Sequence, residues 1–184
     1  RGEYMVSTQA ILDFRKQYLL ELHKRSNNNP FVTDKMPQNF RYVGLISLAF
    51  PKAKIIHVKR NAFAICWSNF KMFFPSNGLS YSYDLNDLVT YYGLYQDLMQ
   101  FWQKQYDNRI YNLDYDKLTL NQEEETRQLM DYLELKWENS CLYPQDNKRS
   151  VKTASNLQIR QKVYRGSSQQ WLKYEPYIKD SFNN

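Results

Sequence analysis

The stretch Lys54-Ile55-Ile56-His57-Val58-Lys59-Arg60-Asn61 carries the strongest strand signal in the chain. Residues 55–58 are nearly continuous in apolar or β-branched character, which is typical of a parallel strand covered on both faces. Asn61 follows at once as a candidate helix N-cap, and a helical apolar pattern continues to residue 74. The stretch therefore predicts a buried strand that passes directly into a helix.

Outward from this stretch, strands alternate with helices along the chain. Two further strands are predicted at residues 31–34 and 109–114, and apolar residues at helical spacing predict helices over 8–24, 39–50, 84–106, 123–134 and 167–177. This alternation indicates an α/β fold with a parallel sheet. Sheets of this kind usually have about five strands. We therefore expect the first strand–helix–strand unit or one edge to be missing, and residues 1–184 to form one domain.

Composition sets limits on the function. The 42% of hydrophobic residues argue against a disordered chain, and no apolar run approaches the ~18–20 residues that span a bilayer. Without a signal peptide, we expect a soluble, cytoplasmic protein. The net charge of +6 fits an anionic ligand, a nucleic acid or an anionic surface. The two cysteines and two histidines lack the spacing of metal ligands, so no metal site is expected.

The residues that follow the predicted strands are suited to a nucleotide. In open α/β sheets, ligands lie beyond the carboxyl ends of the strands, and those positions hold Lys35, Lys59-Arg60 and Tyr115. An arginine beside a helix N-terminus offers a bidentate fork to phosphate oxygens. Ser68, two turns into the helix, adds a hydroxyl donor. The alternative for Arg60 is an ordinary salt-bridging residue at a strand end.

Three ordered blocks resemble the sulfotransferase family. The first is Asp34-Lys35-Met36-Pro37 with Phe50-Pro51-Lys52-Ala53-Lys54-Ile55-Ile56, the second is Tyr115-Asp116-Lys117-Leu118, and the third runs over residues 151–175. The chain is most similar to bacterial sulfotransferases associated with tetratricopeptide repeats and to tyrosylprotein sulfotransferases. The resemblance implies a P-loop NTPase-like three-layer α/β sandwich with a parallel sheet.

The same resemblance implies a donor and site residues. The donor would be 3′-phosphoadenosine-5′-phosphosulfate, which leaves adenosine 3′,5′-bisphosphate, and no metal is implied. Arg60 and Ser68 match the pair that grips the 3′-phosphate, and Tyr115 matches an aromatic residue near the adenine. Lys35 matches a lysine near the transferring sulfuryl group, and Ser155 matches a serine near the bridging oxygen. Since charge grows on the leaving phosphate, a cation such as Lys35 would aid transfer.

The C-terminal segment that closes over the nucleotide in this family matches Arg160, Lys162, Tyr164 and Arg165. Alternative alignments shift Gln161 and Lys162 by one position, so the individual cation stays open. The acceptor, a hydroxyl of a carbohydrate, a peptide tyrosine or a small metabolite, is not readable from the sequence. The loop over residues 73–83 either lines the acceptor site or is a packed surface loop.

The chain also departs from the family pattern. None of its five glycines lies in the Gly-rich loop that cradles the 5′-phosphosulfate in the family. We therefore expect a chain without the first strand–P-loop–helix unit, and His23 does not replace the missing catalytic base. An exposed sheet edge would invite oligomerisation, and we expect weak or no activity from this chain alone.

Two other classes of function stay open. A kinase would need carboxylates for Mg²⁺ after the strands, and Asp114 and Asp116 stand there, but the pattern favours solvated acids at a helix start over that role. A non-catalytic module that binds nucleotides, RNA or a protein would fit the charge and the 16 tyrosines. No RNA-binding motif is present and the basic residues gather in one segment, so nucleic acid is not the expected partner.

Overall fold

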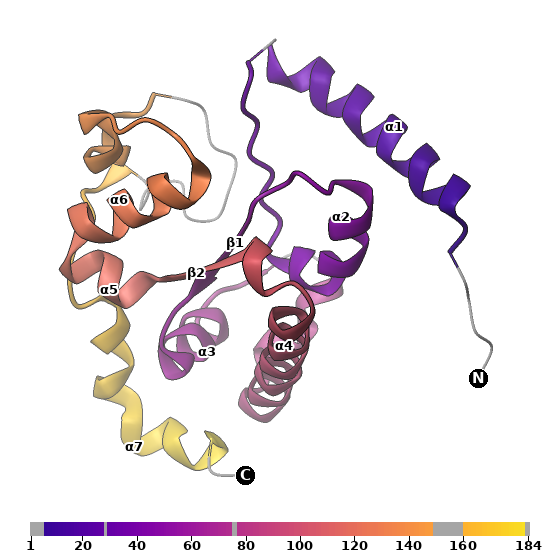
Figure 1. Ribbon diagram of the computed structural model, residues 1–184. Helices are drawn as coiled ribbons and strands as arrows, with labels where there is room; N and C mark the ends of the chain where they lie inside the picture. Colours follow the sequence, from indigo (N-terminus) through magenta and orange to yellow (C-terminus); the bar gives the residue numbers. More distant parts are fainter. Residues whose placement is uncertain (1–5, 28, 75–76, 149–159, 183–184) are drawn as a thin grey trace. The chain divides into compact units, whose positions relative to one another are not determined.

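The computed structural model describes residues 6–27, 29–74, 77–148 and 160–182 (Figure 1). Contacts divide the chain into two compact units. The first unit comprises Arg1–Ala53 and Asp97–Arg109, and the second comprises Lys54–Gln96 and Ile110–Asn184. Helix α4 (Leu85–Gln105) contributes its first part to the second unit and its last part to the first. No helix in the described ranges is long and apolar enough to cross a membrane.

The first unit is helical. Helix α1 (Thr8–Ser26) begins where the Ser7 hydroxyl accepts a hydrogen bond from the backbone N–H of Ala10, and ends at Asn27 in the left-handed region. A 3₁₀ helix, η1 (Pro37–Tyr42), then leads into α2 (Val43–Ala49), and η3 (Asp107–Arg109) closes the unit. The predicted helix over 8–24 is confirmed, whereas the one predicted over 39–50 is split in two.

Arg109 and Trp102 tie α2 to the rest of the first unit. Arg109 donates to the carbonyls of Ser47 and Phe50, at 3.0 and 2.9 Å, and so binds the C-terminal end of α2. The Trp102 indole N–H donates to the Phe40 carbonyl at 2.8 Å. Gly44 permits this approach, because a Cβ there would lie 2.8 Å from the Trp102 ring. Arg109 of η3 therefore holds α2, and Trp102 of α4 holds η1.

The prediction of a strand at residues 31–34 is wrong. This segment has no strand structure, and Phe31 and Val32 are 70% and 42% exposed. Extended backbone becomes a strand only when a neighbouring strand takes up its N–H and C=O groups. Here the attachment is made by a side chain instead, since the Tyr18 hydroxyl donates to the Asp34 carboxylate. Burial and this carboxylate raise the pKa of Tyr18 to about 12.

The second unit contains a parallel pair of strands, β1 (Ile55–Lys59) and β2 (Ile110–Asp114), with His57 opposite Asn112 (Figure 1). Both strands and their parallel direction were predicted. Ile56 and Val58 nevertheless remain 38% and 54% exposed, so the expected cover on both faces of β1 is not found. The sheet of the described residues has two strands, which is consistent with an α/β fold but shows no three-layer sandwich.

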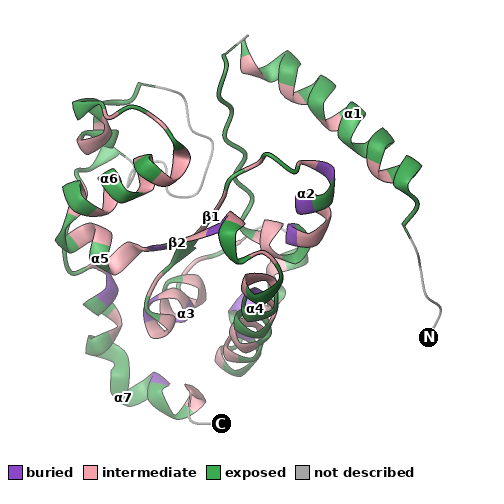
Figure 2. Ribbon diagram, in the orientation of Figure 1, coloured by how far each residue is buried: buried purple, intermediate pink, exposed green. Residues whose placement is uncertain are grey.

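Helices follow each strand of the second unit. Helix α3 (Ala62–Phe70) comes directly after β1, and α5 (Tyr115–Leu120) directly after β2. The second unit also contains α6 (Gln122–Leu133) and the short 3₁₀ helices η2 (Asn77–Tyr83), η4 (Asn139–Leu142) and η5 (Pro144–Asp146). Buried positions gather on β2 and α3 (Figure 2), including Leu113, Ala64 and the fully buried Cys66. Burial raises the pKa of the Cys66 thiol to about 12, so it is an inert core residue.

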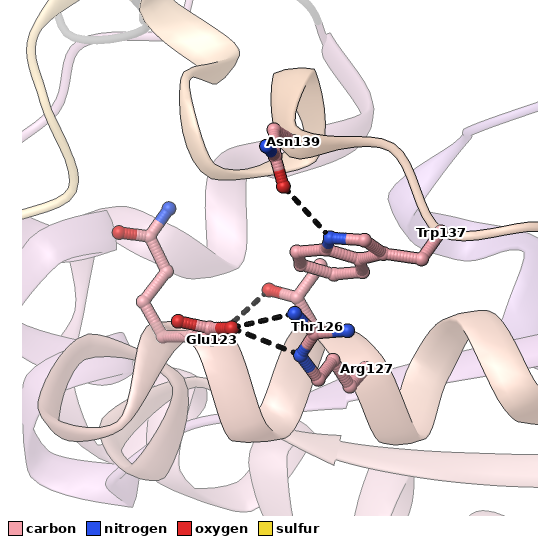
Figure 3. Close-up of polar contacts among 6 residues, drawn as sticks. Glu123, Thr126, Arg127, Trp137 and Asn139 are labelled. Carbon is pink, nitrogen blue, oxygen red and sulfur yellow. Dashed lines mark hydrogen bonds and ion pairs between the residues drawn. The ribbon is translucent and has the colours of Figure 1, made fainter.

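A surface cluster holds the chain where it leaves α6. The Arg127 guanidinium lies 3.9 Å from the centre of the Trp137 ring and donates twice to the Glu123 carboxylate, at 2.7 and 2.9 Å. The Trp137 indole N–H donates to the Asn139 side chain at 3.0 Å (Figure 3). The cluster therefore links α6 to the start of η4.

Residues 167–182 form the short helices η7 (Ser167–Tyr174), α7 (Glu175–Ile178) and η8 (Lys179–Phe182). One helix was predicted over residues 167–177. Pro176 explains the break, because its ring would meet the carbonyl of the preceding turn in a continuous α-helix. It stands instead in the first turn of α7, where no N–H is needed.

Candidate functional site

Arg60 lies where β1 gives way to α3, and two residues from other segments hold its side chain. Its Nε–H donates to the Ser168 hydroxyl at 2.7 Å. Its guanidinium carbon lies 5.5 Å from the centre of the Tyr115 ring, a cation–π contact. The side chain is therefore fixed at the nitrogen nearest its stem and along one flat face.

The charge of Arg60 is not neutralised by a neighbouring acid. No ion pair joins it to a carboxylate in the described part of the chain, although Lys54, Lys24, Arg25 and Arg127 all form ion pairs there. A half-buried guanidinium usually has a carboxylate partner, since removing charge from water is costly. An oriented, unpaired cation at a strand end is the arrangement that an anionic ligand requires.

The start of α3 is partly occupied by the protein itself. The Asn61 side chain accepts from the backbone N–H of Ala64, which confirms the predicted N-cap. The backbone N–H of Asn61 donates to the Asp116 carboxylate at 3.0 Å. That N–H is therefore taken by a side chain of the protein and is not open to a phosphate. Asp114 likewise caps α5 by accepting from the N–H groups of Asp116 and Lys117.

These contacts weaken the case for a magnesium-dependent kinase. Both acids that follow β2 are engaged in capping helix starts, which is the ordinary role left open above. No group of three or more His, Cys, Asp or Glu residues in the described ranges is arranged to hold a metal ion.

The C-terminal segment lies along α3 in a regular series of contacts. Phe63 stacks on Trp171 with ring centres 4.4 Å apart, and Trp67 packs on Tyr174 at 4.3 Å. Residues three apart share a face of a 3₁₀ helix, so Ser168, Trp171 and Tyr174 form one face of η7. That face meets Arg60, Phe63 and Trp67 in the same order.

The structure brings together only some of the residues that the sequence singled out. Arg60 and Tyr115 are adjacent. Ser68 lies on the exposed side of α3, and no hydrogen bond of its side chain is found to another described residue. Ser168, which is 6% exposed, was missed. The three-residue spacing of Ser168, Trp171 and Tyr174 could have revealed it. This spacing is the period of a 3₁₀ helix, whereas the sequence was searched for the period of an α-helix.

Other predicted residues have separate places. Lys35 is an exposed residue of the first unit, just before η1. Ser155 lies outside the described residues. Lys162 and Tyr164 are exposed, Tyr164 by 44%.

The two predicted arginines of the C-terminal segment bind backbone carbonyls. Arg160 donates to the Asn147 carbonyl, and Arg165 donates to the Leu120 carbonyl at 2.8 Å. Leu120 is the last residue of α5, whereas Tyr115 is the first. Because a helix rises ~1.5 Å per residue, this anchor lies about 7 Å along α5 from the Tyr115 backbone. Arg165 therefore acts as a cap at the far end of α5.

His57 is not a further cation of the site. Its ring contacts Asn112 Oδ1 at 2.8 Å and the Tyr95 hydroxyl at 2.5 Å. Burial lowers its pKa, and the positive charge of Lys59 acts in the same direction. The ring is therefore neutral near pH 7, with its proton on Nδ1 facing the Asn112 oxygen.

The chain is similar to known proteins over most of its length. The sequence model of the sulfotransferase family matches residues 6–139, which is more than half of the chain. An uncharacterized protein of Aquifex aeolicus (strain VF5) is 38% identical over 180 residues, and the match covers 92% of this chain but 24% of that relative. The chain thus spans about a quarter of the length of the curated relative that it matches. With a strand-end arginine, an adjacent tyrosine and a family match over most of its length, the chain belongs to the sulfotransferase family.

Proposed function

We propose that this chain carries the 3′-phosphate and adenine side of the donor site of a sulfotransferase, which transfers a sulfuryl group from 3′-phosphoadenosine-5′-phosphosulfate to a hydroxyl acceptor. One observation carries the proposal. Arg60 is oriented by Ser168 and Tyr115, yet no carboxylate of the described residues pairs with it. An anionic ligand supplies the missing negative charge.

The 3′-phosphate suits this arginine because a guanidinium binds phosphate oxygens through two parallel N–H donors. Ser68, on the exposed side of α3, is assigned the second contact to the same phosphate. The hydroxyl of a serine both donates and accepts, so it can serve an oxygen that the arginine leaves open.

Tyr115 is assigned to the adenine. Its ring is half-buried, and the Arg60 guanidinium takes one face. The proposal gives the opposite face to the base, since adenine stacks on aromatic rings and gains about 1–3 kcal/mol from such a contact.

The residues that act on the sulfuryl group are assigned by family resemblance. Lys35 would neutralise charge near the transferring group, and Ser155 would lie near the bridging oxygen. The donor supplies the sulfuryl group, and the protein contributes position and positive charge. Arg160, Lys162, Tyr164 and Arg165 belong to the segment proposed to close over the nucleotide. The acceptor is a hydroxyl compound of a class that stays open.

The proposal is tested by titrating the chain with adenosine 3′,5′-bisphosphate and with adenosine 5′-monophosphate in a calorimeter. The bisphosphate should bind more tightly, without any requirement for Mg²⁺. Arg60→Ala should weaken its binding about tenfold or more, as expected for the loss of hydrogen bonds to a charged group.

Arg15→Ala is the matched control. Arg15 is exposed on α1 in the first unit, and its removal changes the net charge by the same amount. This variant should bind the bisphosphate like the parent chain. The proposal fails if the parent does not distinguish the two nucleotides, or if both arginine variants lose affinity equally.

A further inference from the structure

We propose that Ser168 is a positioning residue, which holds Arg60 so that its two terminal nitrogens face the 3′-phosphate of the donor. The inference rests on the proposed function and adds a residue that neither the sequence pattern nor the family match over residues 6–139 assigns. It also gives the C-terminal segment a defined part in recognising the nucleotide.

The geometry of a guanidinium explains why one hydrogen bond decides its orientation. The group offers two bidentate edges, one formed by Nε with one terminal nitrogen and one formed by the two terminal nitrogens. Ser168 takes the Nε–H of Arg60 at 2.7 Å. A phosphate is therefore left with the end-on edge.

Tyr115 restricts the rotation of the Arg60 guanidinium. Its ring lies under the guanidinium at 5.5 Å, which disfavours rotation of the planar group out of that stack. Among the described residues, no ion pair pulls the terminal nitrogens elsewhere. The hydroxyl and the ring together prepare the arginine before the ligand arrives, which reduces the entropy lost on binding.

Ser168 is itself held in place. It is 6% exposed, so its hydroxyl has little competition from water. Two aromatic contacts on the same face of η7 fix its backbone relative to α3, namely Trp171 on Phe63 and Tyr174 on Trp67. Because α3 begins two residues after Arg60, this packing sets the distance between the hydroxyl and the arginine.

If Ser168 positions Arg60, its loss should affect some contacts to the nucleotide and not others. Loss of the Ser168 hydroxyl should harm recognition of the 3′-phosphate and leave the adenine and the 5′ side untouched. A residue that merely supports the fold would weaken the binding of all adenine nucleotides alike.

The experiment measures the affinity of this chain for adenosine 3′,5′-bisphosphate and for adenosine 5′-monophosphate in four forms: the parent, Ser168→Ala, Ser167→Ala and Ser168→Thr. Ser168→Ala should lose about three- to tenfold in affinity for the bisphosphate, in keeping with one hydrogen bond to a charged group. Its affinity for the monophosphate should not change. Ser167→Ala, at a neighbouring position of η7, is expected to match the parent, and Ser168→Thr to recover most of the loss because it keeps the hydroxyl.

A double variant separates positioning from support. In Arg60→Ala, the further change Ser168→Ala should have no effect on bisphosphate binding, because its only route to the phosphate is gone. Losses that add in the double variant, or equal losses for both nucleotides, overturn the inference. Failure of the parent to prefer the bisphosphate overturns the proposed function and this inference together. A preference for the bisphosphate that is as large in Ser168→Ala as in the parent overturns the inference alone.

A measurement without ligand completes the test. The Nε–H of Arg60 should give a resolved, slowly exchanging proton signal in the NMR spectrum of the parent chain, since it is bonded to a buried hydroxyl. Ser168→Ala should lose that signal while the backbone amide spectrum of α3 is retained. Persistence of the signal in the variant would show that Ser168 does not hold the arginine.

Discussion

The rings of Phe63 and Trp171 are stacked, with centres 4.4 Å apart and planes inclined by 14°. Phe63 belongs to α3 and Trp171 to η7, so the stack joins the helix after β1 to the end of the chain. The centre of the Phe182 ring also lies 4.0 Å from the centre of the Phe63 ring. This contact keeps the C-terminal segment against the helix that follows Arg60.

Trp171→Ala should therefore affect both stability and ligand binding. Removing a partly buried tryptophan from an aromatic pair should lower the free energy of unfolding by about 1–3 kcal/mol, below the loss in a closed core. Bisphosphate affinity should fall as well, because Ser168 loses its support. Urea denaturation and calorimetric titration measure the two effects. Tyr177→Ala, at a position 82% exposed, is the control and should change neither.

The strand–helix unit around Arg60 was readable from the sequence because its signals are local. The apolar run, the cap and the helical spacing all lie within residues 54–74. The structure confirms β1, the Asn61 cap and α3, although α3 ends at Phe70 and not at residue 74. The parallel direction of β1 and β2 followed from the helical pattern between them, which allows a parallel crossover, whereas their register was not predicted. The strand, the cap and the helix each depend on residues that are neighbours in sequence.

The features that the sequence did not predict correctly depend on contacts between residues far apart in sequence. Residues 31–34 have the composition of a strand, but a strand also needs a partner, and composition does not supply one. Ser168 contacts Arg60 across a long sequence separation, and a serine in a polar run has no local mark of that contact. The pairing depends on where η7 packs, which single residues do not encode. The residue that best explains Arg60 was therefore the one that sequence reasoning missed.

Gly44→Ala and Gly93→Ala should have opposite effects. Both glycines lie in helices, where alanine is intrinsically better by about 0.5–1 kcal/mol. A Cβ at Gly44 would meet the rigid Trp102 ring at 2.8 Å, while a Cβ at Gly93 would meet no atom within 4 Å. We expect Gly44→Ala to destabilise by about 1–3 kcal/mol through overpacking, and Gly93→Ala to stabilise slightly.

Denaturation midpoints in urea give the comparison. The indole N–H signal of Trp102 in the NMR spectrum offers a second readout for Gly44→Ala, because this N–H is bonded to the Phe40 carbonyl and should be displaced. A Gly44→Ala variant as stable as Gly93→Ala would mean that the indole moves aside without cost.

The cluster of Arg127, Glu123 and Trp137 should depend more on its ring than on its ion pair. The Arg127–Glu123 pair is an exposed pair four residues apart on α6, with side chains 48% and 57% exposed, and such pairs are worth about 0.3–0.5 kcal/mol. The ring stacks on the guanidinium at 3.9 Å and also donates to Asn139. Glu123→Gln should therefore cost little, and Trp137→Ala about 1–2 kcal/mol.

Salt provides the discriminating measurement. The small effect of Glu123→Gln should vanish in ~1 M NaCl, where the Debye length is about 3 Å, whereas the effect of Trp137→Ala should persist. Equal salt sensitivity of the two variants would contradict the assigned order.

His57 should make the stability of the chain depend on pH. Its ring lies between β2 and α4, bonded to Asn112 and to Tyr95, and burial lowers its pKa below the ordinary value of 6.5. The unfolded chain then binds a proton before the folded chain does. The stabilising effect of the neutral ring is present above pH 6.5 and is lost as the pH falls below it toward the folded pKa. Burial also raises the pKa of Tyr95 to about 12, so that its hydroxyl stays a donor throughout this range.

The free energy of unfolding in urea, measured from pH 7.5 down to 5, tests the sign. The parent should lose stability over this interval, and His57→Gln should lose less, because glutamine has no proton to gain. Tyr95→Phe removes the donor to Nε2 and should cost about 1 kcal/mol at pH 7.5, since it leaves a part-buried acceptor without that partner. His23→Gln is the matched control, as His23 is exposed on α1 and its loss should leave the pH profile of the parent intact. A parent chain that gains stability on acidification would show that the buried ring is charged in the folded state, contrary to the desolvation that dominates its surroundings.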